Sequence, residues 1–307
     1  MSSSPSPAEA AIGSPAVALI LQWYEQHARD LPWRGQTVSP WAVLVSEVML
    51  QQTPVARVTP VFEAWMAQWP TPEELASATT GAAVKAWGRL GYPRRALRLH
   101  AAATTCVDRH HGKVPATVAE LRALPGVGEY TAAAVASFAF GQRHAVLDTN
   151  VRRVHARLLD GNEFERPGAA TTAERRRALD LLPKPPQQAS LVSVAVMELG
   201  ATICTAKSPS CSACPVIGQC KWHMNGHQPW AGAPRKGQTY AGTDRQCRGR
   251  LLAAVRDSKQ PLTRDALCAE WSDAKQSERA LRSLLADRLI EELKEVGKTG
   301  PCYQLPT

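Results

Sequence analysis

The sequence predicts a mostly α-helical protein followed by a linker and a smaller unit, and three features of its 307 residues support this organisation. From about residue 15 to residue 230 the apolar residues recur at helical spacing, with few of the alternating patterns that a β-sheet requires. Proline and glycine interrupt this pattern and divide it into short helices. The composition changes at 224–243, where Asn, Gly, Gln, Pro and Thr predominate, as is typical of a linker.

The positions of proline and glycine predict where the helices break. The breaks fall near Leu31–Pro40, Trp69–Pro72, Gly88–Pro93, Gly112–Pro115, Pro125–Gly128, Gly141 and Pro183–Pro186. Beyond the linker, residues 244–307 form a small unit with three predicted amphipathic helices. Those helices are outlined by Leu251, Leu252, Val255, Leu267, Trp271, Leu281, Leu284, Leu285 and Leu289. A β-hairpin over Leu293 to Leu305, interrupted by Gly297 and Gly300, completes a winged-helix-like domain.

The composition is typical of a soluble globular protein with a basic surface. Hydrophobic residues make up 44% and charged residues 21%, which excludes a wholly disordered chain and a coiled-coil rod. Lys and Arg number 36 against 27 acidic residues, and this net charge of +9 favours nucleic acid or an anionic membrane surface as the partner. No run approaches the roughly 20 apolar residues of a membrane-spanning helix, so we expect no membrane partner.

Residues 1–14 predict a disordered tail. They are rich in Ser, Pro and Ala, carry no Lys or Arg, and lack the apolar segment of a secretory signal. We therefore expect a cytoplasmic protein whose eight cysteines stay reduced. Clustered cysteines in such a protein are more often metal ligands than disulfide partners.

Four of the cysteines form a compact loop. Cys204, Cys211, Cys214 and Cys220 follow one another with six, two and five intervening residues. This spacing suits a structural zinc ion or a [4Fe–4S] cluster, both of which take four cysteine ligands. Unligated buried thiols are the remaining alternative. The scattered cysteines, which we expect to be packing residues, are Cys106, Cys247, Cys268 and Cys302.

A glycine-containing turn separates two predicted helices, Val118 to Ala123 and Thr131 to Phe140. Its glycines, Gly126 and Gly128, permit backbone angles with positive φ, and the N–H groups of such a turn at a helix start can bind a phosphate. A plain connection between two helices is the alternative, because a GxG string alone is a weak signal.

Two acidic residues, Asp148 and Glu47, lie at positions that suggest a catalytic role. Asp148 lies between an apolar stretch and a helical pattern, so it is either a helix N-cap or a catalytic group. Glu47 lies in the very apolar segment Trp41–Thr53, which we expect to be one helix. Burial raises the pKa of a carboxyl group, so this glutamate can keep a proton near neutral pH and act as a general acid. A buried glutamate satisfied by polar neighbours is the alternative.

These motifs together resemble a known family. The cysteine spacing resembles the iron–sulfur loop of DNA glycosylases related to endonuclease III and MutY, and the glycine turn followed by Asp148 resembles the helix-hairpin-helix and aspartate of the same superfamily. The strings LPWR at 31–34 and SEVMLQQT at 46–53 resemble MutY, the adenine glycosylase branch, much more than endonuclease III. The resemblance extends over roughly residues 15–225.

The resemblance implies a fold, a cofactor and a partner. The fold is a helix-hairpin-helix glycosylase, with a six-helix barrel at 36–141 and an iron–sulfur cluster domain made of 15–35 and 142–223. The cysteine loop is expected to hold a structural [4Fe–4S] cluster and not zinc. The expected partner is double-stranded DNA with a mispaired or damaged base, and the expected protein is a nucleoid-associated monomer.

The resemblance also implies residue roles. Glu47 is expected to protonate adenine, and Asp148 to stabilise the positive charge that develops on the sugar. The resemblance assigns Trp33, Arg34, Val55 and Glu198 to the adenine pocket, and Gln52, Thr53 and Tyr92 to the wedge at the lesion. It places Tyr130 and Asn150 beside Asp148. It assigns Gly126 and Gly128 to the contact with the DNA backbone. Taken singly, Trp33, Val55 and Tyr92 suit a core, and Arg34 suits a solvated surface.

Tyr130 separates two reaction types in this superfamily. Endonuclease III-type enzymes carry a lysine nucleophile at this position, and here no lysine lies between Lys113 and Lys184. We expect hydrolytic removal of adenine opposite 8-oxoguanine or guanine with little strand cleavage. The alternatives are a thymine glycosylase for G·T mismatches, which can also carry this tyrosine, and a non-catalytic iron–sulfur regulator that binds DNA.

Two features depart from the MutY pattern. Tyr92 is followed by Pro93 where a second tyrosine is usual, so we expect a stiffer wedge loop. The segment 244–307 is too short for the Nudix-like domain that recognises 8-oxoguanine in many MutY enzymes.

The segment 85–113 is strongly basic. It has seven basic residues and one acidic residue, 7 − 1 = +6, and is expected to contact phosphates. Its basic residues are Lys85, Arg89, Arg94, Arg95, Arg98, Arg109 and Lys113.

Overall fold

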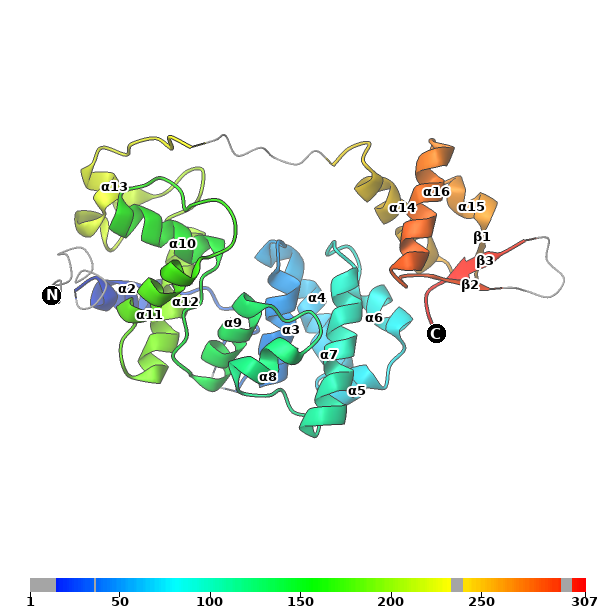
Figure 1. Cartoon of the computed structure of the whole chain (residues 1–307), viewed down its shortest axis with the longest axis horizontal. Helices are drawn as coiled ribbons and strands as arrows, with labels where there is room; N and C mark the ends of the chain where they lie inside the picture. Colours follow the sequence, from blue (N-terminus) through cyan, green and yellow to red (C-terminus); the bar gives the residue numbers. More distant parts are fainter. Residues whose placement is uncertain (1–14, 36, 233–239, 294–299) are drawn as a thin grey trace. The chain divides into compact units, whose positions relative to one another are not determined.

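The computed structural model describes residues 15–35, 37–232, 240–293 and 300–307, and it is mostly helical, as predicted (Figure 1). The predicted tail, part of the predicted linker and part of the predicted hairpin lie outside the described residues. The chain divides into two compact units. The first comprises Met1–Val43, Ala116–Arg122 and Val127–Pro234, and the second comprises Leu44–Pro115, Ala123–Gly126 and Arg235–Thr307.

In the first unit, one long helix forms the centre of the packing. Helix α12 (Pro186–Thr202) packs against α2 (Pro15–His27) and α10 (Thr149–His155). The apolar faces of these helices form one core that includes Ile20 and Leu199. The unit also contains α9 (Glu129–Phe140), α11 (Thr172–Leu181), α13 (Lys221–Met224) and most of α8 (Val118–Ala123).

The second unit contains helices that surround buried tryptophans. Its helices are α4 (Val55–Gln68), α5 (Pro72–Ala76), α6 (Thr80–Trp87), α7 (Arg94–His110) and most of α3 (Pro40–Leu50). The ring of Trp65 meets those of Trp69 and Trp87 edge-on, with centroids 4.7 and 5.7 Å apart. Such pairs add to the stabilisation that comes from buried area.

The predicted helix breaks are confirmed, and one predicted helix was too long. Each predicted break falls between two helices or at a helix end, as at Gly141, which ends α9 with φ of 62°. The segment Trp41–Thr53 is not one helix, because α3 ends at Leu50. Gln52 has a left-handed φ of 54°, and Pro54 disfavours helical geometry in the residue before it, so Gln52 and Thr53 lie in a turn.

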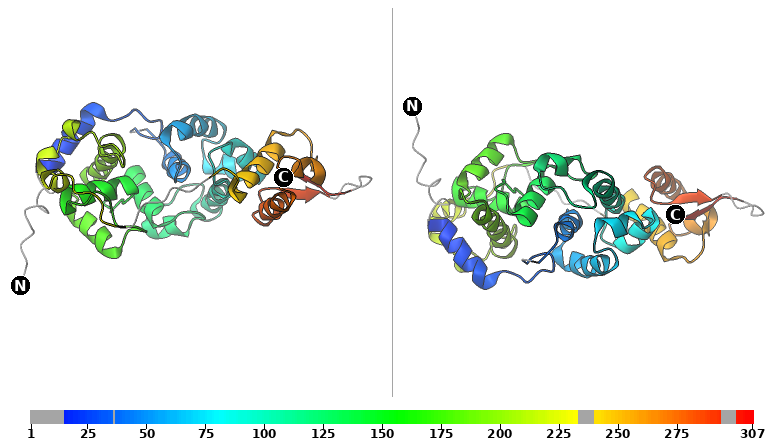
Figure 2. Two further views of the ribbon diagram at one scale, coloured as in Figure 1. Left: turned by 90° about the horizontal axis from the view of Figure 1, so that it is seen from above. Right: turned by 90° about the horizontal axis from the view of Figure 1, so that it is seen from below.

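The C-terminal residues of the second unit form three helices and a small sheet, drawn in gold to red in Figure 2. The helices are α14 (Asp244–Asp257), α15 (Arg264–Cys268) and α16 (Ala274–Ala286). The antiparallel strands follow the order β1-β3-β2, with β1 at Leu262–Thr263, β2 at Glu291–Leu293 and β3 at Cys302–Gln304. β1 was not predicted, because two residues are too few to show a period-two pattern.

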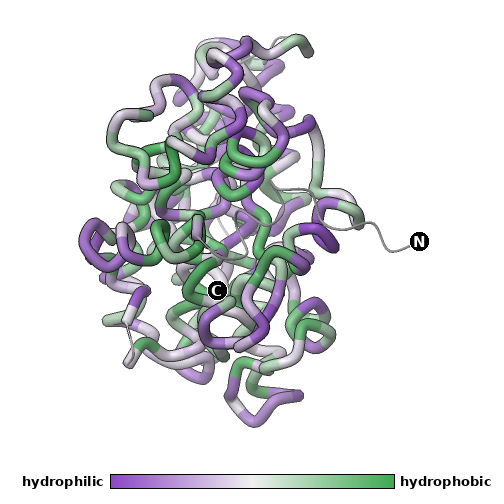
Figure 3. The backbone as a smooth tube through the Cα atoms, turned by 90° about the vertical axis from the view of Figure 1, so that its left-hand side faces the viewer, coloured by the Kyte–Doolittle hydropathy of each residue, from purple (hydrophilic) through white to green (hydrophobic). Residues whose placement is uncertain are grey.

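Hydrophobic and hydrophilic residues follow one another along much of the tube in Figure 3, as expected for helices that bury one face. No helix in the described ranges is long and apolar enough to cross a membrane.

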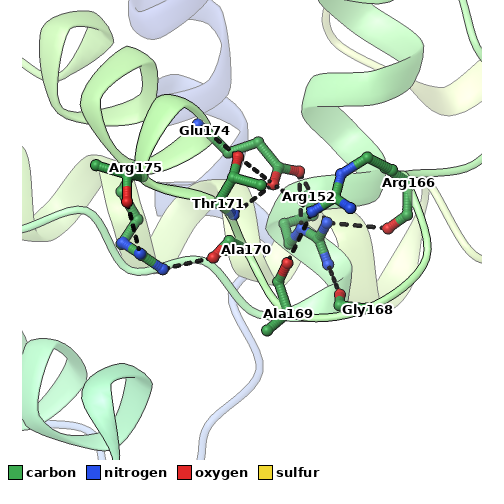
Figure 4. Close-up of polar contacts among 9 residues, drawn as sticks. Arg152, Arg166, Gly168, Ala169, Ala170, Thr171, Glu174 and Arg175 are labelled. Carbon is green, nitrogen blue, oxygen red and sulfur yellow. Dashed lines mark hydrogen bonds and ion pairs between the residues drawn. The ribbon is translucent and has the colours of Figure 1, made fainter.

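Glu174 connects the loop before α11 to α10 through hydrogen bonds. Its carboxylate accepts hydrogen bonds from the Thr171 backbone N–H (2.6 Å) and from Arg152 Nη2 (2.8 Å), and the Arg152 guanidinium also donates to the carbonyls of Arg166 and Gly168 (Figure 4). Partial burial alone would raise the pKa of Glu174. The hydrogen bonds from Thr171 and the charge of Arg152 outweigh it and lower this pKa to about 2.

Replacing Glu174 with glutamine is expected to lower the free energy of unfolding at neutral pH by about 1 kcal/mol, because the capping box and the ion pair with Arg152 are weakened. Since the folded-state pKa lies below the ordinary 4.5, the wild type loses this stabilisation as the pH falls from about 4.5 towards 2. Urea unfolding at pH 7 and pH 3 measures both effects. An equal difference between the two proteins at both pH values would contradict this account.

Candidate functional site

Asp148 is the N-cap of α10. Its Oδ1 accepts a hydrogen bond from the Val151 backbone N–H (2.7 Å), and its Oδ2 accepts one from Asn150 Nδ2 (2.7 Å). Burial is the largest influence on this carboxyl group and raises its pKa, against the opposing effect of the two hydrogen bonds and of Arg153. Asp148 thus has the N-cap geometry that the sequence left open beside a catalytic role, and its carboxylate is partly desolvated.

A buried arginine links Asn150 to the cysteine loop. Arg153 Nη2 donates to Asn150 Oδ1 (2.7 Å) and to the Gly200 carbonyl (2.6 Å), and its Nε donates to the Cys204 carbonyl (2.8 Å). Asn150 in turn donates to Asp148. A continuous chain of hydrogen bonds thus runs from Asp148 to the backbone of the first cysteine in the loop.

Gly200 allows α12 to lie directly against this chain. A Cβ atom at Gly200 would lie 2.8 Å from both the Cβ and the carbonyl oxygen of Asn150, which is closer than real contacts permit. The contact involves the first turn of α10 and not the end of a flexible side chain, so relief requires a shift of the backbone.

Replacing Gly200 with alanine is expected to destabilise the fold by about 1–3 kcal/mol, because overpacking exceeds the gain in helix propensity. The shift of Asn150 should also loosen the hydrogen bond to Asp148. Thermal unfolding measures the first effect. At Gly218 a Cβ would meet nothing within 4 Å, so Gly218→Ala is the matched control and is expected to change stability by no more than about 0.5 kcal/mol. Equal stability of the two variants would contradict the packing argument.

Glu198 is fully buried, with 0% exposure, and is held by two arginines. Arg29 donates to it through Nε (2.6 Å) and Nη2 (2.9 Å), and Arg34 Nη2 donates at 2.9 Å. Burial alone would raise the pKa of Glu198, but the hydrogen bonds from Arg29 and the charge of Arg34 outweigh it and lower this pKa. The structure therefore brings together two of the predicted pocket residues, Arg34 and Glu198. Trp33, the residue before Arg34, is buried as well.

One nitrogen of the Arg34 guanidinium, Nη1, is buried and has no hydrogen-bond partner among the described residues. A buried unpaired donor is costly unless something accepts from it. The expectation that Arg34 is a solvated surface residue does not apply.

Glu47 lies on α3, which is buried along almost its whole length. The Glu47 residue is only 6% exposed, and its neighbours Val43, Leu44 and Val48 are buried as well. The sequence prediction of a glutamate within an apolar helix is therefore confirmed. Val55, also assigned to the pocket, is partly buried at the start of α4.

The predicted wedge residues differ in exposure. Thr53 is buried, whereas Gln52 is exposed and the Tyr92 residue is 48% exposed. Tyr92 was expected to be a core residue if it had no role in DNA binding, and its exposure excludes that alternative. Both Gln52 and Tyr92 have left-handed backbone angles, with φ of 54° and 47°.

The glycine turn is present between α8 and α9. Gly126 has a φ of 81°, and a Cβ there would lie 2.7 Å from the Cβ of Arg98, so glycine is required. Gly128 is the N-cap of α9 with a φ of −88°, so it does not use the positive φ that glycine permits. It is exposed, and a Cβ there would enter open space. Tyr130, in the first turn of α9, packs against a small cluster of Ala133, Ala134 and Val146.

The four clustered cysteines line one cavity, together with Arg157, Trp222 and His223. All eight cysteines are described, and all are free thiols. Arg157 Nη1 donates to Cys204 Sγ at 3.3 Å. Burial raises the pKa of Cys214 to about 11, so this thiol is protonated unless a metal binds it. In the described ranges, no three Cys, His, Asp or Glu side chains converge as they do around a single metal ion.

The predicted basic surface loses one of its members. Arg95 is only 6% exposed and donates inward, so it cannot belong to a phosphate-contacting surface. The other basic residues of the segment are all exposed: Lys85, Arg89, Arg94, Arg98, Arg109 and Lys113.

Arg29 and Arg153 were given no role from the sequence, and Arg95 was placed on the basic surface, although all three are hydrogen-bond donors to predicted site residues or to their neighbours. Arg153 and Arg157 are four positions apart and so share one helix face, but the same run contains Arg152 and His155, so its pattern does not single out Arg153 as buried. For Arg29 no local signal existed, because its partner is 169 positions away.

Comparison with known proteins gives a consistent result. Residues 45–179 match the family described as HhH-GPD superfamily base excision DNA repair protein. The adenine DNA glycosylase of Mycobacterium tuberculosis is 51% identical over 274 residues, which cover 88% of each chain. A thermostable thymine-DNA glycosylase has a similar structure, with a TM-score of 0.63 and 27% identity over 71% of this chain and 99% of that one. Endonuclease III trapped covalently on DNA shares the fold, with a TM-score of 0.59 and 24% identity over 69% of this chain and 95% of that one.

Proposed function

Because the chain belongs to the HhH-GPD superfamily of base excision DNA repair proteins, and within it to the adenine DNA glycosylases, we propose that it removes adenine paired with 8-oxoguanine or guanine from double-stranded DNA. The observation that carries this proposal is the 51% identity with the Mycobacterium tuberculosis protein over 88% of both chains. Hydrolysis of the N-glycosidic bond requires that adenine first leaves the base stack.

Glu47 is proposed as the general acid that protonates a ring nitrogen of the extruded adenine. Its burial on α3 supports this role, because a desolvated carboxyl group holds its proton more tightly and can deliver it near neutral pH. Protonation converts the base into a better leaving group, and the bond to the sugar then lengthens.

Asp148 is proposed to stabilise the positive charge that develops on the sugar as the bond breaks. Its hydrogen bonds to Val151 and Asn150 fix the direction of the carboxylate before the reaction, and Arg153 holds Asn150 in turn. A carboxylate that is already oriented and partly desolvated stabilises such a charge more strongly than one in water.

Arg34 and Glu198 are proposed to bind adenine together with Trp33 and Val55. The unpaired Nη1 of Arg34 supplies a donor for a ring nitrogen, and Glu198 keeps the guanidinium in place. For the wedge at the lesion, the proposal assigns the exposed Gln52 and Tyr92, with Thr53 buried behind them.

DNA binding is proposed through the turn at Gly126 and Gly128 and the exposed basic residues of the segment 85–113. The exposed N-terminus of α9 presents backbone N–H groups, which suit a phosphate. Such contacts position the duplex without reading its sequence.

A [4Fe–4S] cluster is proposed on Cys204, Cys211, Cys214 and Cys220, which line one cavity. A zinc ion also takes four cysteine ligands, and the cluster is preferred because the cysteine spacing resembles the iron–sulfur loop of related DNA glycosylases. The bound cluster supplies cross-links that hold the loop 204–220 in one shape, and Arg157 offsets its negative charge. Equal iron and acid-labile sulfide without zinc is the expected metal content.

The domain division is proposed on the same basis: a barrel at 36–141, a cluster domain at 15–35 and 142–223, and a winged-helix-like domain at 244–307. For the last of these, the order α14, β1, α15, α16, β2, β3 supports the proposal.

Four duplexes, with adenine or thymine opposite guanine or 8-oxoguanine, test the proposed substrate. The strand that carries the adenine should break at the adenine position, and only after treatment with alkali. The enzyme itself should not cut the strand, since Tyr130 replaces the lysine that a lyase uses. Breakage without alkali would contradict the proposed hydrolysis. Base loss from the thymine duplexes would instead favour a thymine glycosylase, which the structural similarity to such an enzyme makes the second candidate.

A further inference from the structure

Two exposed residues have backbone angles that residues other than glycine rarely adopt. Gln52 lies in the turn after α3 and Tyr92 in the turn before α7, and both have left-handed φ values, 54° and 47°. This conformation costs free energy in residues other than glycine and persists only where the surroundings enforce it. Something in the second unit therefore holds both turns in place.

One buried side chain binds both turns at once. Arg95 Nη1 donates to the carbonyls of Val48 (2.9 Å), Met49 (3.0 Å) and Gln51 (2.6 Å). Its Nη2 donates to Thr53 Oγ1 (2.9 Å) and to the Gly91 carbonyl (3.0 Å). The residues that flank Gln52 on both sides, and the residue before Tyr92, thus share a single guanidinium.

The chemistry of this position requires arginine. The last carbonyls of α3 have no partner within the helix, and a cation at a helix C-terminus is favourable. A planar guanidinium can serve acceptors in two turns, whereas an ammonium group is a compact point charge. Burial lowers the pKa of Arg95 to about 10, so it stays charged at neutral pH. Its guanidinium carbon also lies 5.2 Å from the Trp87 ring and 5.6 Å from the Tyr92 ring.

We propose that Arg95 is a positioning residue that sets Gln52 and Tyr92 jointly in the conformation in which they enter DNA at the lesion. The inference rests on the proposed function, because it concerns how the protein opens the DNA at the lesion. It assigns Arg95 no effect on the chemical step. Arg95 acts only through the two exposed residues and touches no DNA itself.

A double-mutant cycle on the full-length protein tests this inference. Single-turnover adenine excision opposite 8-oxoguanine is measured for the wild type, Arg95→Met, the double variant Gln52→Ala/Tyr92→Ala, and the triple variant. Arg95→Met is expected to slow excision about tenfold or more in the wild-type background and less than about twofold in the double variant. Arg95→Lys, which keeps the charge but not the planar fork, should show the same pattern and replaces Arg95→Met in the cycle if the latter does not fold.

Arg94→Met is the matched control, because it removes the same charge one position earlier from an exposed side chain. Its effect on excision is expected to be the same factor in both backgrounds. 2-Aminopurine beside the lesion gives a second readout, since its fluorescence reports unstacking whether or not a base is removed. The Arg95 variants should lose this signal in the wild-type background only.

Equal losses from Arg95→Met or Arg95→Lys in both backgrounds would overturn the inference, as would wild-type rates and fluorescence in these variants. A wild-type protein that releases no adenine would overturn the proposed substrate. The fluorescence cycle would then still decide whether Arg95 acts through Gln52 and Tyr92.

Discussion

Replacing Glu47 with glutamine is expected to slow the single-turnover release of adenine by about 100- to 10,000-fold, the usual contribution of a general acid. Glutamine has nearly the same shape as glutamate, so the apolar packing along α3 should survive the change. The amide has no acidic proton, so adenine leaves unprotonated. Affinity for the lesion duplex should stay close to that of the wild type.

Rapid-quench kinetics with enzyme in excess measure the rate, and fluorescence anisotropy measures duplex affinity. Glu63→Gln is the matched control, because Glu63 is an exposed carboxylate on α4 of the same unit. It is expected to excise adenine at the wild-type rate. A Glu47→Gln variant within about tenfold of the wild type would exclude Glu47 as the general acid.

The second large effect is expected for Asp148→Asn, which should slow adenine release by about 100- to 1,000-fold or more, because the variant lacks the charge that stabilises the developing cation. Asparagine keeps an oxygen that can accept from the Val151 N–H, so α10 should still begin at the same residue. Duplex binding is therefore expected to persist.

The stability of the Asp148→Asn variant has an expected sign. The folded-state pKa of Asp148 is raised, chiefly by burial, so ionisation of this group at neutral pH disfavours the folded state. Removing the charge should leave the variant at least as stable as the wild type at pH 7. This advantage should shrink as the pH falls through the raised pKa and disappear below the ordinary value of 3.8.

Thermal unfolding between pH 4 and pH 8 measures this, with Asp180→Asn, an exposed aspartate on α11, as the control. A large loss of stability at pH 7 would mean that Asp148 is required mainly as a cap. Unchanged excision would exclude its proposed role in the reaction.

The sequence predicted the parts of the molecule whose causes are local. Proline and glycine limit the backbone wherever they occur, so the breaks at Pro72, Gly141 and Pro186 could be predicted without any knowledge of packing. The apolar neighbours of Glu47 likewise indicated its burial, because the helical period places them around it.

The sequence could not predict features that depend on distant partners. Arg95 was assigned to the basic surface, because charge alone does not distinguish an exposed arginine from one that donates to the end of another helix. The pairing of Arg29 with Glu198 joins positions 169 residues apart. The turn at Gln52 was predicted as helix, because Pro54 restricts only the residue directly before it, whereas the carbonyl of Gln51 accepts from Arg95, 44 positions away.

The central claim is that this chain hydrolyses the glycosidic bond of mispaired adenine by means of Glu47 and Asp148. Its most direct test is the amount of free adenine released from an 8-oxoguanine·adenine duplex, measured by chromatography with mass detection for the wild type, Glu47→Gln and Asp148→Asn. We predict stoichiometric free adenine from the wild type and almost none from either variant in the same time. Release of another base by the wild type, or adenine release by both variants at the wild-type rate, would contradict it.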